Sequence, residues 1–376
     1  MDLRAIPLLD HHCHAIRIPH EPLDGKGLRR CFVETTDAQM LPYVRSSIFY
    51  MRALRDLAAL IGCAADEETY LAVRAATPPA EHIRRLFDAG NFSHLLVDTG
   101  FGSARSYDLD ELSAVTGIPV APIVRLETLM ESLIVTHESM AQVEDAMRAE
   151  LQAARARGLV GFKSIAAYRG GLAVQKRTLA EATAAFGALK EVVRRNGRVR
   201  LSDRAVLEYL LRAALEEAAA LDMPVQFHVA FGDDDADLRT ANPLQLRALL
   251  QDPAFRHVPF VLLHCYPYMR EAGYLAALYA HVFVDVSLTV PLTAHGSSAA
   301  FSEVLELAPI AKVLFATDAH SIPELFYIGA LHGRRALTLA LERLIAADFL
   351  TATQAEAAAE AILWRNAAQL YQLPAA

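Results

Sequence analysis

Histidines and one aspartate stand at the ends of short apolar runs that are far apart in the chain. They are His12 and His14 in LLDHHCHAI, His228 in PVQFHVAFGD, His264 in PFVLLHCYPY and Asp318 in KVLFATDAHS. Imidazole nitrogens and carboxylate oxygens are common protein ligands of zinc and similar divalent ions. If each run is a strand of one parallel α/β barrel, these side chains meet at its catalytic face. The pattern therefore predicts a metalloenzyme whose ion is held by His12, His14, His228 and Asp318.

The HHCH segment is the most specific single element. Side chains at positions i and i+2 of a strand point the same way, so His12 and His14 should face the barrel mouth while Cys13 turns toward the helices. The same alternation predicts that His11 faces away from the pair and packs against a helix. A lone histidine at a strand end is more often structural. It is the recurrence at the first, fifth, sixth and last runs that indicates a site.

Eight apolar runs have the character of strands. They span residues 7–14, 93–100, 119–126, 159–165, 224–229, 259–266, 282–288 and 312–319. Most are separated by amphipathic stretches of helical period, rich in Ala, Leu, Glu and Arg. Short apolar strands that alternate with helices are typical of a parallel sheet covered by helices, and eight such units predict an α/β fold, a (β/α)8 TIM barrel. A doubly wound sheet is the alternative, but it would carry a Gly-rich phosphate turn, and no GxGxxG follows the first run.

The composition is that of a globular protein with a substantial core, since 53% of the 376 residues are hydrophobic. Residues 1–376 are predicted to form a single barrel domain, because no linker, low-complexity tract or internal repeat divides them. The net charge is −8 and no basic stretch is interleaved with aromatics, so we expect a small-molecule substrate and no nucleic-acid partner. The lack of a long apolar run or signal-peptide pattern predicts no membrane contact. Four cysteines without CxxC spacing fit a cytoplasmic protein.

Two connections are longer than ordinary loops. The first, residues 15–91, follows the first strand, and its helices are predicted to form a lid over the metal or a subunit contact in a homo-oligomer. The second, residues 166–223, contains YRGGL before two helices. Its Gly170-Gly171 pair predicts a tight loop at the barrel mouth.

Together these motifs resemble the amidohydrolase superfamily, from Leu8 to about Leu373. The matching features are HxH after the first strand, Lys163 in GFKSI after the fourth, His228 after the fifth, His264 after the sixth and Asp318 after the eighth. The GFKSIAAYRGGL segment and the helices after the first strand look most like the amidohydrolase-2 branch, which includes the domain fused to glutamine-synthetase-like proteins. The resemblance implies a TIM barrel with a metal site. It leaves the reaction open among hydrolysis, decarboxylation and sugar-acid isomerisation.

The roles of the site residues follow from the chemistry of a hydrated ion. Such an ion lowers the pKa of its water toward neutrality, and Asp318 would accept that water's proton and deliver it to the leaving group. His264 would either hold a second ion or donate a hydrogen bond to the substrate carbonyl. In binuclear members of the family, the lysine at the position of Lys163 carries a carbamate that bridges two ions. Alternatively, its ammonium pairs with a substrate carboxylate, aided by Tyr168 and Arg169. We favour the second role and one zinc or similar ion, with two ions as the alternative.

Three functions fit these residues. The first is metal-dependent hydrolysis of a C–N, amide-type bond in a small carboxylate-bearing substrate. The second is metal-dependent decarboxylation of a small aromatic or unsaturated acid. The third is a catalytically silent, metal-stabilised scaffold, in which Asp318 has no chemical task. Asp98, Arg125, Glu127 and His320 also lie near strand ends, either as substrate contacts or as members of buried ion pairs.

Overall fold

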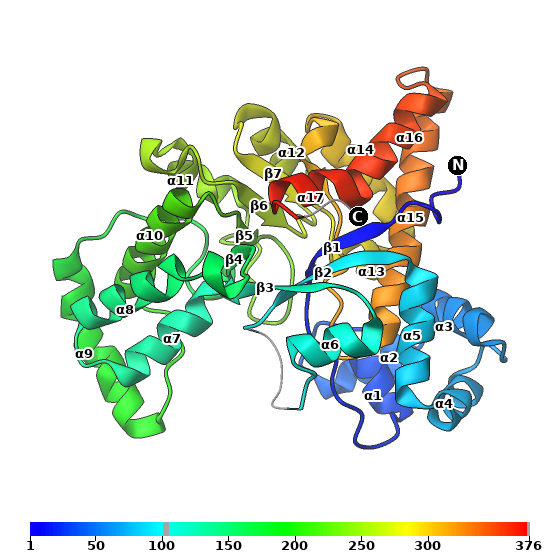
Figure 1. The fold of residues 1–376 in the computed structure, drawn as a ribbon, viewed down its shortest axis with the longest axis horizontal. Helices are drawn as coiled ribbons and strands as arrows, with labels where there is room; N and C mark the ends of the chain where they lie inside the picture. The colour runs from blue at the N-terminus through cyan, green and yellow to red at the C-terminus, as the bar shows by residue number, and fades with distance from the viewer. Residues whose placement is uncertain (101–104, 374–376) are drawn as a thin grey trace.

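The computed structural model describes residues 1–100 and 105–373. Its sheet has eight parallel strands, hydrogen-bonded in sequence order from β1 to β8 (Figure 1). The strands are β1 (Leu8–Cys13), β2 (Phe92–Asp98), β3 (Val120–Arg125), β4 (Gly161–Ser164), β5 (Val225–His228), β6 (Phe260–Leu263), β7 (Val282–Asp285) and β8 (Val313–Leu314). Each strand overlaps one predicted run, so the (β/α)8 prediction is confirmed. The sequential order excludes the doubly wound alternative.

The barrel closes where the chain leaves β8. This strand has only two residues, but the backbone after it continues beside β1. The N–H of Asp318 donates to the carbonyl of His12 at 3.0 Å, and the N–H of His14 donates to the carbonyl of Ala319 at 2.8 Å. These two bonds bring the first and last predicted ligand segments together at the mouth.

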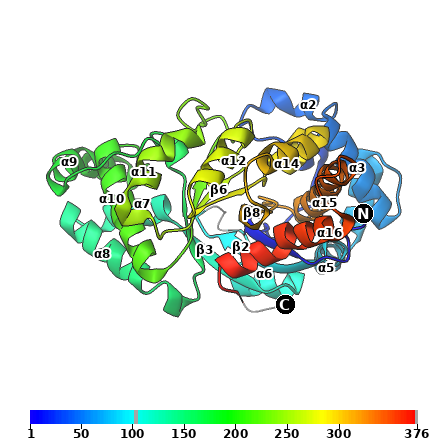
Figure 2. The same cartoon turned by 90° about the horizontal axis from the view of Figure 1, so that it is seen from above.

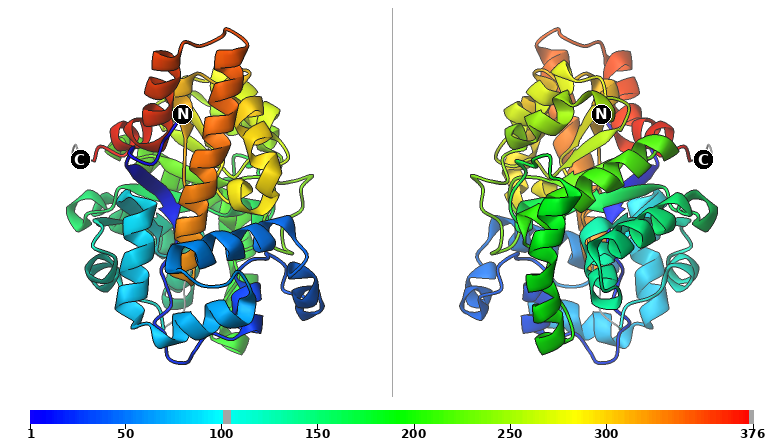
Figure 3. Two further views of the ribbon diagram at one scale, coloured as in Figure 1. Left: turned by 90° about the vertical axis from the view of Figure 1, so that its right-hand side faces the viewer. Right: turned by 90° about the vertical axis from the view of Figure 1, so that its left-hand side faces the viewer.

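The α-helices surround the sheet. In chain order they are α1 (Gly25–Arg30), α2 (Leu41–Val44), α3 (Ile48–Ile61), α4 (Glu67–Ala76), α5 (Pro79–Gly90), α6 (Leu109–Thr116), α7 (Leu126–Thr136), α8 (Met140–Gln152), α9 (Leu179–Asn196), α10 (Arg204–Leu221), α11 (Arg247–Gln251), α12 (Met269–Leu278), α13 (Thr289–Thr293), α14 (Ser297–Leu305), α15 (Pro323–Ala346), α16 (Ala352–Glu360) and α17 (Asn366–Leu370). Figure 2 shows α7 to α11 gathered at one end of the molecule and α2, α3 and α14 to α16 toward the other. The long α15 packs against α5 (Figure 3). The chain between β1 and β2 therefore carries α1 to α5, and the two helices expected before β5 are α9 and α10.

The tight loop predicted after β4 is confirmed. The N–H groups of Gly170 and Gly171 both donate to the carbonyl of Ala166, at 3.1 and 3.0 Å. Gly171 has a φ of +91°, and a Cβ on it would lie 2.8 Å from the Cβ of Thr240. Only glycine suits this position, because a side chain would be strained there and would also clash. The loop holds Tyr168 at the barrel mouth.

Apolar side chains fill the barrel below the mouth. The interior cluster consists of Leu9, Leu96, Ile123, Val261, Leu263 and Leu314, with Ala367, Ala368 and Tyr371 from the C-terminal segment. The ring of Tyr371 lies beside Gly161, the first residue of β4. Its hydroxyl accepts a hydrogen bond from Gln226 Nε2 at 2.8 Å. The C-terminal segment therefore closes the amino end of the barrel, and polar groups begin above Tyr371.

In the part of the chain that the structure describes, no helix combines the length and the apolar character needed to cross a bilayer. All four cysteines are free thiols. Cys13 lies in the core outside the barrel, as alternation along β1 predicts.

Candidate active site

One cavity of about 240 Å³ at the barrel mouth collects the predicted site. Its lining includes His12, His14, Lys163, Tyr168, Arg169, His228, His264 and Asp318. These are the residues for which the sequence predicted a ligand or catalytic role, together with Tyr168 and Arg169. Of the four further strand-end residues, Arg125 and His320 also line the cavity, whereas Asp98 and Glu127 do not. The structure brings the lining residues together in one place, and their individual chemical roles remain predictions.

His12, His14 and Asp318 make the closest contacts in this cavity. Asp318 Oδ1 lies 3.1 Å from Nε2 of His12 and 3.1 Å from Nε2 of His14. Ligand atoms about 2.0–2.2 Å from one tetrahedral ion are roughly 3.4 Å apart. The three side chains therefore have a spacing suited to sharing one cation. His264 is next to them, with Nδ1 at 3.8 Å from Asp318 Oδ2.

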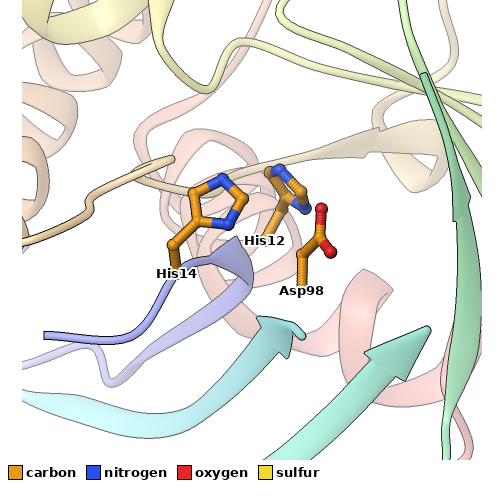
Figure 4. Close-up of side chains that lie close together, drawn as sticks. All are labelled: His12, His14 and Asp98. Carbon is orange, nitrogen blue, oxygen red and sulfur yellow. The ribbon is translucent and has the colours of Figure 1, made fainter. Parts of the chain in front are cut away.

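The carboxylate of Asp98, at the end of β2, lies close to His12 and His14. Ligand atoms of Asp98, His12 and His14 all lie within 4.8 Å of one another (Figure 4). Asp98 is fully buried, and Arg125 donates to its Oδ2 at 3.0 and 2.5 Å. Burial alone would raise the pKa of Asp98, but the charge of Arg125 brings it down to about 2. The ion-pair role expected for Asp98 is thus confirmed, and its carboxylate also lies beside His12 and His14.

Gln226 determines which nitrogen of His12 faces the cavity. Its Nε2 donates to the carbonyl of His11 at 2.7 Å, so its amide oxygen is the atom 2.8 Å from His12 Nδ1. Because that oxygen can only accept, Nδ1 carries the proton and Nε2 keeps its lone pair. Burial, aided by the charge of Lys163, lowers the pKa of His12 to about 3, so the ring is neutral. The Nε2 lone pair then faces the Asp318 carboxylate, an arrangement that a cation between them stabilises.

A chain of hydrogen bonds orients His264 in the same way. Ser287 Oγ lies 2.9 Å from Asp285 Oδ1 and 2.9 Å from His264 Nδ1. The Asp285 carboxylate takes the single hydroxyl proton of Ser287, so His264 donates from Nδ1 and keeps a lone pair on Nε2. Burial lowers the pKa of His264 to about 4. The nitrogen of His264 that lies 3.8 Å from Asp318 Oδ2 is therefore the protonated Nδ1. Both roles of His264, ligand of a second ion and donor to substrate, stay predictions.

His228 lies between His264 and Tyr168. Its ring centroid is 4.4 Å from that of His264 and 4.3 Å from that of Tyr168. Burial holds the pKa of His228 well below its ordinary value, so the ring is neutral, and its Nε2 donates to the carbonyl of Phe231 at 3.0 Å. Within the described ranges, His228 is not a member of the clusters whose ligand atoms lie within 4.8 Å of one another. Its role as a ligand stays a prediction.

Gly232 allows this close packing and was not singled out from the sequence. A Cβ at this position would lie 1.9 Å from Tyr168 Oη and 3.0 Å from His228 Nε2. A real Cβ does not approach that closely, so only glycine fits without displacing one of the two rings. The available signal was its place in the FGD turn directly after β5.

Lys163 lies in β4, fully buried, with Nζ 3.3 Å from His12 Nε2. Burial lowers the pKa of Lys163 to about 8, although the charges of Asp98 and Asp318 oppose this shift. The ammonium form is therefore still the main form at neutral pH.

The other cations of the cavity are paired with carboxylates. The pairs are Arg125 with Asp98, Arg169 with Glu131 at 3.0 Å and Arg200 with Asp235 at 2.9 Å. Considering only residues 1–100 and 105–373, no carboxylate forms such a contact with Lys163. Lys163 is therefore the cavity cation with the most capacity to bind an anionic group of a substrate.

The alternation expected along β1 is wrong at His11. The ladder between β1 and β2 pairs Asp10 with Leu95 and Cys13 with Val97. β1 therefore advances three residues where β2 advances two, which is a β-bulge. The bulge turns both His11 and His12 toward the barrel interior. His11 Nε2 lies 3.0 Å from Asp285 Oδ2, and its ring stacks on Tyr371.

Comparison with known proteins assigns the family. A family model described as amidohydrolase matches residues 132–373, which is more than half of the chain. The chain belongs to the amidohydrolase family. The resemblance carried by the HxH, lysine, histidine and aspartate motifs is therefore confirmed.

Three relatives of this amidohydrolase show how far the similarity extends. Protein fluG of Emericella nidulans is 33% identical over 224 residues, 57% of this chain, and the chain spans only 26% of that protein's length. A Lactobacillus casei ATCC 334 structure, provisionally described as a metal-dependent hydrolase, is 36% identical with a TM-score of 0.89, covering 98% of this chain and 96% of that one. A uronate isomerase from Thermotoga maritima is 13% identical with a TM-score of 0.69, covering 98% and 95%. The isomerase shares the fold alone.

The cluster in this amidohydrolase fits a divalent cation. Neutral imidazoles offer lone pairs, and Asp318 offers a carboxylate. Two carboxylates and several lone pairs that face one another in a buried site are stabilised by a cation.

The remaining polar residues at the barrel mouth either have a structural role or were not predicted from the sequence. Glu127 accepts from Ser164 Oγ at 2.7 Å and from the Ile165 N–H at 2.9 Å, so it braces the end of β4. His320 lines the cavity as a strand-end residue. Glu34, which the sequence did not indicate, lines the cavity from the chain between β1 and β2. No local pattern marks it, because the sequence predicts that the long connection covers the mouth but does not indicate which of its side chains reach the cavity.

Proposed function

We propose that this protein is a metal-dependent hydrolase that cleaves a C–N, amide-type bond in a small carboxylate-bearing substrate. The observation that carries the proposal is the 3.1 Å contact of Asp318 Oδ1 with both His12 Nε2 and His14 Nε2. A carboxylate in that position can orient a water beside the ion and also remove its proton.

Each residue then has a defined task. A divalent cation held by His12, His14 and Asp318, with zinc as the expected ion, supplies the Lewis acidity that activates water at neutral pH. Asp318 accepts the proton of the attacking water on its carboxylate and donates it to the leaving nitrogen. His228 and His264 are the further histidines of the cavity that can contribute ligands to the ion.

Lys163 binds the substrate carboxylate in this proposal. Its ammonium is buried and lies 3.3 Å from His12 Nε2, so a carboxylate bound there would hold the scissile bond next to the ion. The alternative is a carbamate on Lys163 that bridges two ions. Intact-mass measurement of the purified protein would separate the two, since only a carbamate adds the mass of CO₂ to this lysine.

The test compares Asp318→Asn with wild type and with Asp145→Asn. Asp145 is exposed on α8 and serves as the matched control. Protein purified without chelator is analysed for metal content and assayed on a panel of N-acyl amino acids. Asp318→Asn is expected to lower turnover by about 10²–10⁴-fold, because general acid–base catalysis is lost. Asp145→Asn should retain the wild-type rate.

Other outcomes select another function. Release of CO₂ from aromatic carboxylic acids, without hydrolysis of any amide on the panel, would replace the hydrolase with a decarboxylase. Full turnover by metal-loaded Asp318→Asn would contradict the role of this residue as the proton-transfer group. Absence of any turnover in wild-type protein that contains stoichiometric metal would favour the silent scaffold.

A further inference from the structure

A second, larger cavity adjoins the catalytic one. Its volume is about 670 Å³, against about 240 Å³ for the cavity that holds the histidines. Glu34, Asp233 and His320 line both. A molecule that reaches the cluster can therefore extend past these three side chains into the larger space.

The larger cavity is lined mainly by segments that lie outside the barrel strands. Most of its wall belongs to the chain between β1 and β2. The rest comes from the loop that joins β8 to α15, from the first residue of that helix, and from Asp233 after β5. Its apolar lining includes Ile18, Leu23, Val33, Ile83 and Ile322. Apolar walls of this kind favour a hydrocarbon chain or ring.

Arg30 gives this cavity a polar anchor. Its guanidinium forms no hydrogen bond or ion pair within the described part of the chain, and its Nη1 is too buried to be reached from the cavity. Arg74 and His82 also line the cavity, but both contact the buried carboxylate of Glu324. The other guanidinium nitrogens of Arg30 also have no partner among the described residues, and a ligand in the cavity that supplies a carboxylate or carbonyl oxygen would satisfy them.

We infer that the larger cavity is the subsite for the distal part of the substrate, an apolar chain or ring whose far end carries a carboxylate or carbonyl group for Arg30. Ligand cavities commonly measure about 300–1,000 Å³, so the catalytic cavity alone is small for a whole substrate. This inference rests on the proposed function, since it places the reacting bond at the histidine cluster. It narrows the substrate class from a small amide to an elongated one. It also assigns the chain between β1 and β2 a role in substrate selection.

The test measures binding, so it does not require turnover. Straight-chain carboxylic acids from butyrate to decanoate, and dicarboxylic acids from succinate to sebacate, are titrated into the protein as purified by calorimetry. Affinity should rise by about fourfold for each methylene that becomes buried. Dicarboxylates long enough to reach Arg30 should bind more tightly than monocarboxylates of equal length.

Two variants and one control locate the effect. Arg30→Met should abolish the preference for dicarboxylates, whereas Arg55→Met, on the exposed side of α3, should retain it. Val33→Phe should flatten the dependence on chain length, because the larger side chain occupies the cavity. Val33 is only partly buried, so this variant is expected to fold.

The results separate the subsite from the reaction. Affinity that does not change with chain length in wild type, or equal loss of the dicarboxylate preference in Arg30→Met and Arg55→Met, would overturn the subsite. Chain-length-dependent binding without hydrolysis of any amide would support the subsite and contradict the proposed reaction. Hydrolysis of short and long N-acylglycines with equal kcat/KM, together with flat binding, would support the reaction and contradict the subsite.

Discussion

Replacing Gln226 with leucine should weaken the metal site without touching a predicted ligand. Gln226 lies behind the cluster, fully buried in β5, and its amide oxygen accepts from His12 Nδ1 at 2.8 Å. Without that acceptor, the ring of His12 loses the contact that keeps its Nε2 lone pair directed at the cavity. Loss of such an outer partner typically lowers metal affinity by about 10–100-fold.

The same substitution should also lower the stability of the metal-free protein. It removes the hydrogen bond that Gln226 accepts from His12 Nδ1 at 2.8 Å and the two that it donates, to the His11 carbonyl at 2.7 Å and to Tyr371 Oη at 2.8 Å. A buried polar group left without a partner costs about 1–3 kcal/mol. With partial rearrangement, we expect a total loss of about 3–6 kcal/mol in the free energy of unfolding.

The assay uses metal-free protein and a chromophoric chelator that competes for zinc. Gln226→Leu, Gln226→Glu and Gln175→Leu are compared with wild type, and Gln175 is an exposed control. Gln226→Glu keeps an acceptor for His12 Nδ1–H, so its zinc affinity should equal or exceed that of wild type. Its stability should still fall, because a carboxylate oxygen then faces the His11 carbonyl. Zinc affinity of Gln226→Leu within about twofold of wild type would refute the reasoning, since the typical outer-partner effect is at least tenfold.

Three further predictions concern other parts of the molecule. Gly232→Ala should lower the free energy of unfolding by about 1–3 kcal/mol through overpacking. Adding Tyr168→Phe to this variant should recover part of the loss, measured by urea unfolding, because the clashing hydroxyl is gone. No recovery would contradict the predicted clash. Burial and neighbouring carboxylates raise the pKa of Glu34 to about 7, from 4.5, so the stability linked to its proton is present below about pH 4.5 and is lost as the pH rises through about 7. The Tm of Glu34→Gln relative to wild type should therefore increase between about pH 5 and pH 8, and a constant difference would exclude this titration. Glu324→Gln should cost about 3–5 kcal/mol at neutral pH, because the partly buried Arg74 loses its counter-charge. If Arg74→Gln is added, the double variant should cost less than the sum of the two single changes.

Much of the fold could be predicted because its signals are local. An apolar run of four to eight residues followed by an amphipathic helix is recognisable without knowledge of its neighbours. All eight strands were found in this way, including β8, although only two of its residues join the ladder. The strand-end residues that line the catalytic cavity could be predicted for the same reason, since the carboxyl end of every barrel strand leads to one mouth.

The prediction failed where a contact depends on register or on distant side chains. The bulge in β1 turns His11 inward, and strand alternation cannot anticipate one extra residue. The contact that sets the tautomer of His12 joins residues 214 positions apart. Asp98 was expected as a member of an ion pair, but its place at the histidine cluster depends on how β1 and β2 pair.

The amino-acid sequence by itself therefore determined the barrel, its family and the strand-end side chains at the mouth, because apolar periodicity and strand ends are properties of short segments. Only the tertiary structure decided which ring nitrogens face the Asp318 carboxylate, that Lys163 is the cavity cation without a carboxylate in contact among the described residues, and that a larger cavity with Arg30 in its wall adjoins the cluster. The physical reason is that these properties arise from packing between segments far apart in the chain, and no single segment encodes them.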